Sequence, residues 1–120
     1  MEYVSYIVIG LFIFIILQRA LPAKGVRHIS ATDVNKALLN KQLQFIDVRT
    51  SGEFKGNHIK GFKNIPLNLL SKKAERELSK EKEVIIICQS GMRSQQACKK
   101  LKKMGFLEVT NVRGGMNAFN

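Results

Sequence analysis

The chain opens on an apolar run that differs in pattern from everything after it. From Tyr3 to Leu17 it reads YVSYIVIGLFIFIIL, without a charged residue. As a helix rising 1.5 Å per residue, this run is about 22 Å long. Its flanking residues, with Arg19 snorkelling, extend it toward the ~30 Å hydrocarbon core of a bilayer. We therefore predict one transmembrane helix, an anchor within residues 1–21 that contacts the membrane through residues 3–21.

A cleaved signal peptide is the main alternative for this run, and a buried core helix is a third. A signal peptide favours a positively charged start and small residues at the cleavage site, whereas the chain has Glu2 before the run and the sequence QRALP after it. Arg19, Lys24 and Arg27 follow the run and no basic residue precedes it. The positive-inside rule then predicts a single-pass protein of the cell membrane whose domain faces the cytoplasm.

The rest of the chain alternates strand-like and helix-like patterns. Residues 22–28 are predicted to be a polar linker, and residues 29–120 one folded domain. Val84–Ile87 is a continuous apolar run, which is typical of a central parallel strand. Further strands are predicted at residues 45–49 and 107–112, and helices at residues 34–38, 69–78 and 94–104, the first of them entered by a capping box of Ser30 with Asp33. This alternation predicts an α/β fold with an open parallel sheet and helices on both faces.

Composition narrows the possible partners. The chain has 20 Lys+Arg against 9 Asp+Glu, a net charge of +11. It carries no nucleic-acid-binding module, so nucleic acid is not an expected partner. The excess of basic residues has three possible roles: a solvated helix face, attraction to an anionic lipid surface, or the steering of an anionic substrate. The two cysteines, Cys88 and Cys98, have neither a disulfide nor a metal spacing, and we expect no metal and no cofactor.

The segment with the clearest chemistry follows the apolar strand Val84–Ile87. Cys88 ends this strand, and a short loop then leads into a helix. The N–H groups of such a loop and of a helix N-terminus favour negative charge at one point, so they stabilise a nucleophilic thiolate. Ligands also bind outside the carboxyl ends of strands in open α/β sheets. We predict Cys88 as the catalytic nucleophile and the rest of the loop as substrate-binding: Gln89, Ser90, Gly91, Met92, Arg93 and Ser94.

Four blocks in order carry a family resemblance: FIDVRTSGEF at residues 45–54, HIKGFKNIP at 58–66, the loop at 88–94, and GGM at 114–116. Together they cover residues 29–119 and resemble a single-domain rhodanese, a sulfurtransferase of the thiosulfate:cyanide type. Three residues depart from the family pattern at packing positions, namely Asn57, Phe62 and Phe119. The resemblance implies a rhodanese-like fold in which Cys88 takes a sulfane sulfur from thiosulfate or a similar small anionic donor. The Cys88 persulfide would then pass the sulfur to a thiol or protein-thiol acceptor.

Two other functions remain open. Cdc25-like phosphatases and arsenate reductases have a similar fold and loop, with one more residue between cysteine and arginine. The six residues from Cys88 to Arg93 make a tighter ring, which favours sulfur over phosphate or arsenate. The second alternative is a non-catalytic docking or sensing module that uses the same loop to bind an anion or a partner.

Two arginines near the loop have undecided roles. Arg93 either contacts the donor and the thiolate or pairs with Asp47 or Glu53 to hold the shape of the loop. Arg49 resembles a family position near the active site and is predicted to bind substrate at the pocket rim. Structural roles are predicted for three further residues: Asp47, His58 and Cys98.

Overall fold

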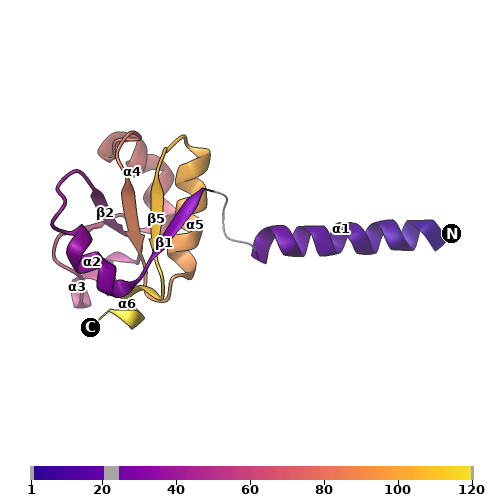
Figure 1. Cartoon of the computed structure of the whole chain (residues 1–120), viewed down its shortest axis with the longest axis horizontal. Helices are drawn as coiled ribbons and strands as arrows, with labels where there is room; N and C mark the ends of the chain where they lie inside the picture. Colours follow the sequence, from indigo (N-terminus) through magenta and orange to yellow (C-terminus); the bar gives the residue numbers. More distant parts are fainter. Residues whose placement is uncertain (1, 21–24, 120) are drawn as a thin grey trace.

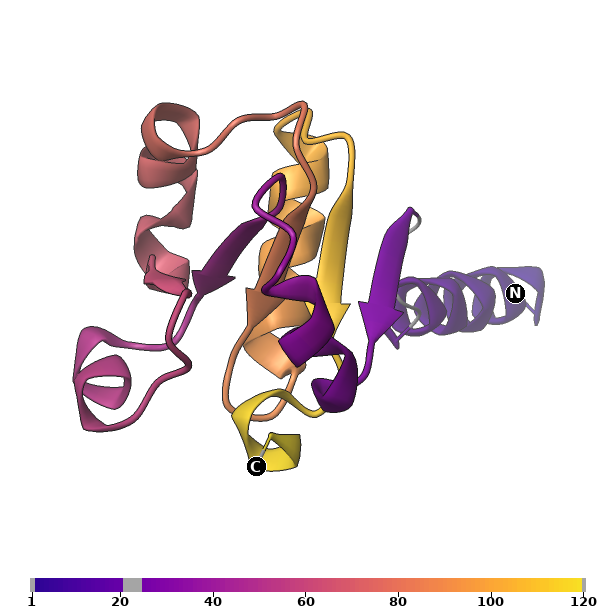
Figure 2. The same ribbon diagram turned by 60° about the vertical axis from the view of Figure 1, so that its left-hand side comes forward.

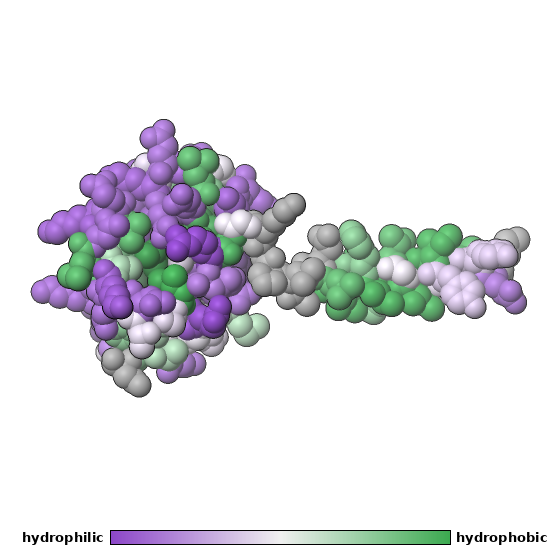
Figure 3. Space-filling model, viewed as in Figure 1, coloured by the Kyte–Doolittle hydropathy of each residue, from purple (hydrophilic) through white to green (hydrophobic). Residues whose placement is uncertain are grey.

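The computed structural model describes residues 2–20 and 25–119, with the backbone alone for residues 18–20. Its first element, helix α1 (Glu2–Ala20), forms where the N-terminal helix was predicted. Figure 1 shows α1 apart from the remaining elements. The large apolar side chains from Tyr3 to Leu17 are between 49% and 81% exposed. Figure 3 shows apolar surface gathered along α1, whereas the surface of the other elements is mainly hydrophilic.

The membrane-spanning role predicted for this helix is not supported. No helix among the described residues is both long enough and apolar enough to cross a membrane. The physical reason is length, because the run Tyr3–Leu17 reaches about 22 Å against a hydrocarbon core of about 30 Å. Polar Gln18 and charged Arg19 close the run. The transmembrane anchor predicted for residues 1–21 is therefore corrected to an exposed apolar helix.

Five parallel strands form one sheet in the order β1-β5-β4-β2-β3. The strands are β1 (Val26–Ile29), β2 (Gln44–Asp47), β3 (Lys63–Asn64), β4 (Val84–Ile87) and β5 (Val109–Val112). The predicted parallel α/β sheet is confirmed. The linker predicted for residues 22–28 is too long, because β1 already begins at Val26 and pairs with β5. Residues 22–24 of that linker lie outside the described residues.

Helices cover both faces of the sheet, as predicted. They are α2 (Ala31–Ala37), α3 (Ser51–Gly56), α4 (Leu70–Glu77), α5 (Met92–Lys103) and α6 (Gly115–Ala118), with a 3-10 turn η1 (Leu67–Leu69) before α4. Residues of α4 and α5 join the core on one face, and residues of α2 and α6 join the core on the other. Figure 2 shows the strands between α2 in front and α5 behind.

Strand β4 explains where Cys88 lies. All four of its residues are buried, which a strand covered on both faces requires. Since side chains alternate along a strand, Val84 and Ile86 join the core beneath α4 and α5, together with Cys88, while Ile85 and Ile87 join the opposite core. The cysteine side chain is thereby directed to the face that α5 covers.

The connections place the cysteine at a crevice of the sheet. β2 and β4 are neighbours, yet the chain leaves β2 toward β3 and leaves β4 toward β5, on the other side. Loops that diverge in this way open a space at the carboxyl ends of the two strands, where open α/β sheets bind ligands. Cys88 follows β4 at this point.

Candidate active site around Cys88

The Cys88 sulfur is enclosed by its own loop. Its side chain is fully buried, and the Gly91 N–H donates to Sγ at 3.0 Å. Gly91 has φ 103°, in the left-handed region, and directly precedes α5. This conformation favours glycine, and it turns the chain from the loop into the helix. Gly91 therefore supplies one of the N–H groups that the sequence predicted would face the sulfur.

A chain of polar contacts leads from the sulfur to the edge of the sheet. The buried Ser94 hydroxyl lies 3.4 Å from Cys88 Sγ and 3.0 Å from the Gly91 carbonyl oxygen. It also hydrogen-bonds to Oδ1 of Asn111, in β5. Nδ2 of Asn111 lies 3.2 Å from Nδ1 of His28, in β1. The Cys88 sulfur is thus linked through two side chains to the first strand.

The N-terminus of α6 fixes the other side of the loop. The Met116 N–H donates to the Cys88 carbonyl at 2.8 Å, and the Asn117 N–H donates to the Gln89 carbonyl at 2.9 Å. Gly115 has φ 56°, and a Cβ atom there would lie 2.2 Å from the Cys88 carbonyl oxygen. No side chain fits in that space. Two carbonyl oxygens of the loop are therefore directed at α6, away from the sulfur.

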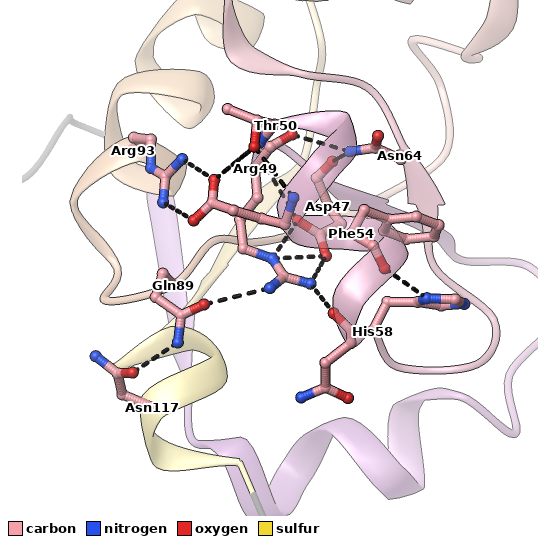
Figure 4. Close-up of polar contacts among 11 residues, drawn as sticks. Asp47, Arg49, Thr50, Phe54, His58, Asn64, Gln89, Arg93 and Asn117 are labelled. Carbon is pink, nitrogen blue, oxygen red and sulfur yellow. Dashed lines mark hydrogen bonds and ion pairs between the residues drawn. The ribbon is translucent and has the colours of Figure 1, made fainter.

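Arg49 lies in a buried network and not at the pocket rim, where the sequence placed it. Its side chain is 3% exposed and pairs with Asp47 at 2.8 Å. It also donates to the Asn57 carbonyl at 2.5 Å and to Gln89 Oε1 at 3.2 Å. Gln89 in turn donates to Asn117 Oδ1 at 2.7 Å, as Figure 4 shows. Arg49 thereby braces the start of the loop, and Asp47 has the structural role predicted for it.

Arg93 forms an ion pair with Glu53, one of the two carboxylates predicted as its partner. Its guanidinium donates to both oxygens of Glu53, at 2.7 and 3.0 Å (Figure 4). Hydrogen bonds from Arg93 and from the Thr50 backbone lower the pKa of Glu53 to about 2. Arg93 also lines a cavity of about 380 Å³ together with residues of η1 and α5, and it is the one residue of the 88–94 loop that does so. The pair ties the start of α5 to α3.

Cys98 is a buried residue of the core, and His58 packs on Phe54. Burial raises the pKa of the Cys98 thiol to about 12, with a smaller contribution from the nearby Cys88. Cys98 is therefore a protonated core thiol at neutral pH. His58 stacks on Phe54 with ring centroids 3.9 Å apart, and its Nδ1 lies 2.8 Å from the Phe54 carbonyl oxygen.

A second cavity, of about 360 Å³, lies beside the loop and was not predicted from the sequence. Its lining residues are His28, Ser90, Gly91, Gln95, Asn111, Arg113 and Gly114. One signal was available: Asn111 is a polar residue between the apolar Val109 and Val112 of a predicted strand, and a buried amide needs a partner. That partner lies on a strand far away in the sequence, so the local pattern did not reveal it.

Comparison with known proteins identifies the class of this fold. Residues 30–120 match the family described as the rhodanese-like domain. The sequence is 32% identical over 95 residues to a sulfurtransferase of Allochromatium vinosum, covering 78% of this chain and 88% of the relative. A crystal structure of a rhodanese-like domain protein from Staphylococcus aureus superposes with a TM-score of 0.71 at 30% identity, covering 78% of this chain and 91% of that one.

The chain therefore belongs to the rhodanese-like domain family. Another relative, YqhL of Bacillus subtilis, is 43% identical over 75 residues, which are 62% of this chain and 59% of YqhL. The chain thus covers less than two thirds of that relative.

We predict that Gly115→Ala destabilises the fold and displaces the Cys88 loop. A Cβ atom at this left-handed position contacts the Cys88 carbonyl, and strain of this kind costs about 1–3 kcal/mol. Gly52→Ala is the matched control, because nothing lies within 4 Å of its Cβ in α3. Urea unfolding of the full chain should show a loss for Gly115→Ala and none for Gly52→Ala. Equal effects of the two substitutions would contradict the conclusion that α6 holds the Cys88 loop in place.

We predict that the Glu53–Arg93 pair gives an acid-dependent part of the stability. The pKa of Glu53 is lowered from 4.5 to about 2 in the folded state, so its contribution is present above pH 4.5 and is lost as the pH falls to about 2. Glu53→Gln keeps a capping residue but removes the charge. Its stability deficit should be seen at pH 7 and disappear between these two values. Glu108→Gln, an exposed substitution, is the control, and a deficit independent of pH would refute the role of the charge.

Proposed function

We propose that the protein is a sulfurtransferase in which Cys88 carries the sulfur. The Cys88 thiolate attacks the outer sulfur of thiosulfate or a similar small anionic donor. A new S–S bond forms at Sγ, the S–S bond of the donor breaks, and sulfite leaves with the electron pair. A thiol or protein-thiol acceptor then takes the outer sulfur from the persulfide and restores the Cys88 thiolate.

The observation that carries this proposal is the Gly91 N–H directed at Cys88 Sγ at 3.0 Å, in a loop of a rhodanese-like domain. A fixed N–H dipole in a buried site stabilises the anionic thiolate and persulfide without reorganising. The six-residue spacing from Cys88 to Arg93 favours sulfur over the larger phosphate or arsenate. The net charge of +11 attracts anionic donors.

A non-catalytic docking or sensing module is the second candidate, and one observation favours it. The Cys88 side chain has no exposed surface, so a donor reaches the sulfur only after part of the loop moves. Ser90 and Met92 are the exposed residues of this loop, and their side chains can move without breaking the core. The test of persulfide formation decides between the two functions.

We predict that incubation of the full chain with thiosulfate adds one sulfur atom to Cys88, measured by mass spectrometry of the intact protein and of its peptides. Cys88→Ser should abolish the adduct. Cys98→Ser is the matched control and should keep it, because the Cys98 thiol is protonated in the core. If neither thiosulfate nor an organic persulfide yields an adduct, the docking module is the better description; release of phosphate from an aryl phosphate would instead show a phosphatase.

We propose further that α1 attaches the domain to the cytoplasmic face of the cell membrane by burying its side chains in lipid. The support is the exposed apolar surface of α1. Monomeric soluble proteins rarely expose a continuous apolar patch of this kind. Its apolar side chains surround the helix, a pattern that requires a surrounding apolar phase. The basic Arg19, Lys24 and Arg27 that follow suit the anionic lipids of the cytoplasmic leaflet.

We predict that the full chain floats with vesicles containing anionic lipid in a density gradient. The double variant Leu11→Glu/Phe14→Glu should stay at the bottom, since a charge in the apolar region costs about 2.5–3.5 kcal/mol. Leu39→Glu, at an exposed leucine of the domain, is the control and should float. If the unmodified chain does not float, α1 has another partner.

A further inference from the structure

The cavity of about 360 Å³ lies at the carboxyl ends of β1 and β5, beside the Cys88 loop. Ser90 and Gly91 line it from the loop, and His28 and Asn111 line it from the two strands. Arg113 comes directly after β5 and also lines the cavity. The Arg113 N–H donates to the Ile29 carbonyl at 2.8 Å, so the backbone that carries this side chain is held in place.

Two contacts connect this cavity to the reacting sulfur. Gly91 lines the cavity, and its N–H lies 3.0 Å from Cys88 Sγ. Asn111 also lines the cavity and hydrogen-bonds to Ser94, whose hydroxyl lies 3.4 Å from the same sulfur. The cavity therefore borders one residue that contacts the sulfur directly and one that reaches it through Ser94.

Charge distinguishes Arg113 from the other arginines of the site. Arg49 is paired with Asp47 and Arg93 with Glu53, so the charge of each is matched by a carboxylate. Arg113 is exposed and forms no ion pair with any described residue, and the lining of the cavity includes no acidic residue. A guanidinium with free donors binds a carboxylate through two parallel hydrogen bonds. Gln95, a residue with a neutral amide side chain, also lines the cavity.

The size of the cavity indicates the class of ligand. Its volume falls in the range that holds small organic molecules, whereas thiosulfate has five heavy atoms and leaves most of it empty. We propose that this cavity binds a small organic thiol that carries a carboxylate, with the carboxylate on Arg113 and the thiol directed at the Cys88 loop. This thiol is the sulfur acceptor, and the proposal rests on the sulfurtransferase function proposed above.

The transfer step balances without an added oxidant or reductant. The acceptor thiolate attacks the outer sulfur of the Cys88 persulfide and forms a new S–S bond. The bond between Cys88 Sγ and the outer sulfur breaks, and its electron pair remains on Sγ as the thiolate. The acceptor leaves as an organic persulfide. Arg113 touches only the carboxylate, so its effect depends on that group.

The test compares two acceptors that differ in the group facing Arg113, namely 3-mercaptopropionate and 2-mercaptoethanol. The kcat/KM for each is measured with the full chain and thiosulfate as donor, and the ratio of the two values is the readout. Arg113→Gln should lower the ratio of 3-mercaptopropionate over 2-mercaptoethanol about tenfold, as the loss of a charge-assisted contact does. Arg113→Lys should keep part of it. Arg27→Gln, which removes an exposed arginine paired with Glu83, is the matched control and should keep the ratio.

An unchanged ratio in Arg113→Gln overturns the proposal. A changed KM for thiosulfate with an unchanged ratio also overturns it, since Arg113 would then serve the donor. A binding measurement separates this outcome from failure of the proposed function. On the Cys88→Ser protein, 3-mercaptopropionate should shift the backbone amide NMR signals of Ser90, Gln95 and Arg113, and Arg113→Gln should abolish these shifts. If these shifts are absent, the proposed binding site is wrong, even where Cys88 forms a persulfide. If the shifts are present but no persulfide forms, the binding site stands and only the sulfurtransferase function is refuted.

Discussion

The close approach of Gly115 to the Cys88 carbonyl is the constraint on which the site depends. The space between the two backbones admits no Cβ atom, and the N–H groups of Met116 and Asn117 bind the first two carbonyls of the loop. Because a peptide group is planar, directing a carbonyl outward directs the following N–H inward. The last helix of the fold thus holds the backbone of Cys88 and Gln89 in place, and the Gly91 N–H further along the loop contacts the sulfur.

Ion pairs then hold this loop from two further sides. The Asp47–Arg49 pair is buried, and breaking such a pair leaves an uncompensated buried charge. Arg49 also donates a hydrogen bond to the side chain of Gln89, at the start of the loop. The Glu53–Arg93 pair is about one-third exposed and connects α3 to the start of α5. Both pairs join separate parts of the fold, whereas Arg113, a residue outside the cysteine motif, forms no ion pair with any described residue.

Features that depend on neighbouring residues were predictable from the sequence, and features that depend on distant ones were not. Strand β4, the capping box of Ser30 with Asp33 and the Cys88 loop are all local. Helix α3 begins with a second capping box, Thr50 with Glu53, which is equally local. The contact of His28 with Asn111 joins residues 83 positions apart through the register of β1 and β5. The N-terminal helix was predicted correctly from its apolar run, but its length did not support a span.

The hydroxyl of Ser94 couples the charge of the sulfur to the cavity wall. It has a single proton and three neighbours, namely Cys88 Sγ, the Gly91 carbonyl and Asn111 Oδ1. While Cys88 is a thiol, its S–H can donate to Ser94, and Ser94 donates onward to an oxygen. A thiolate or persulfide anion only accepts, so the Ser94 hydroxyl can then donate its proton to the sulfur. That proton is withdrawn from the Gly91 carbonyl or from Asn111 Oδ1, and Asn111 lines the cavity of about 360 Å³.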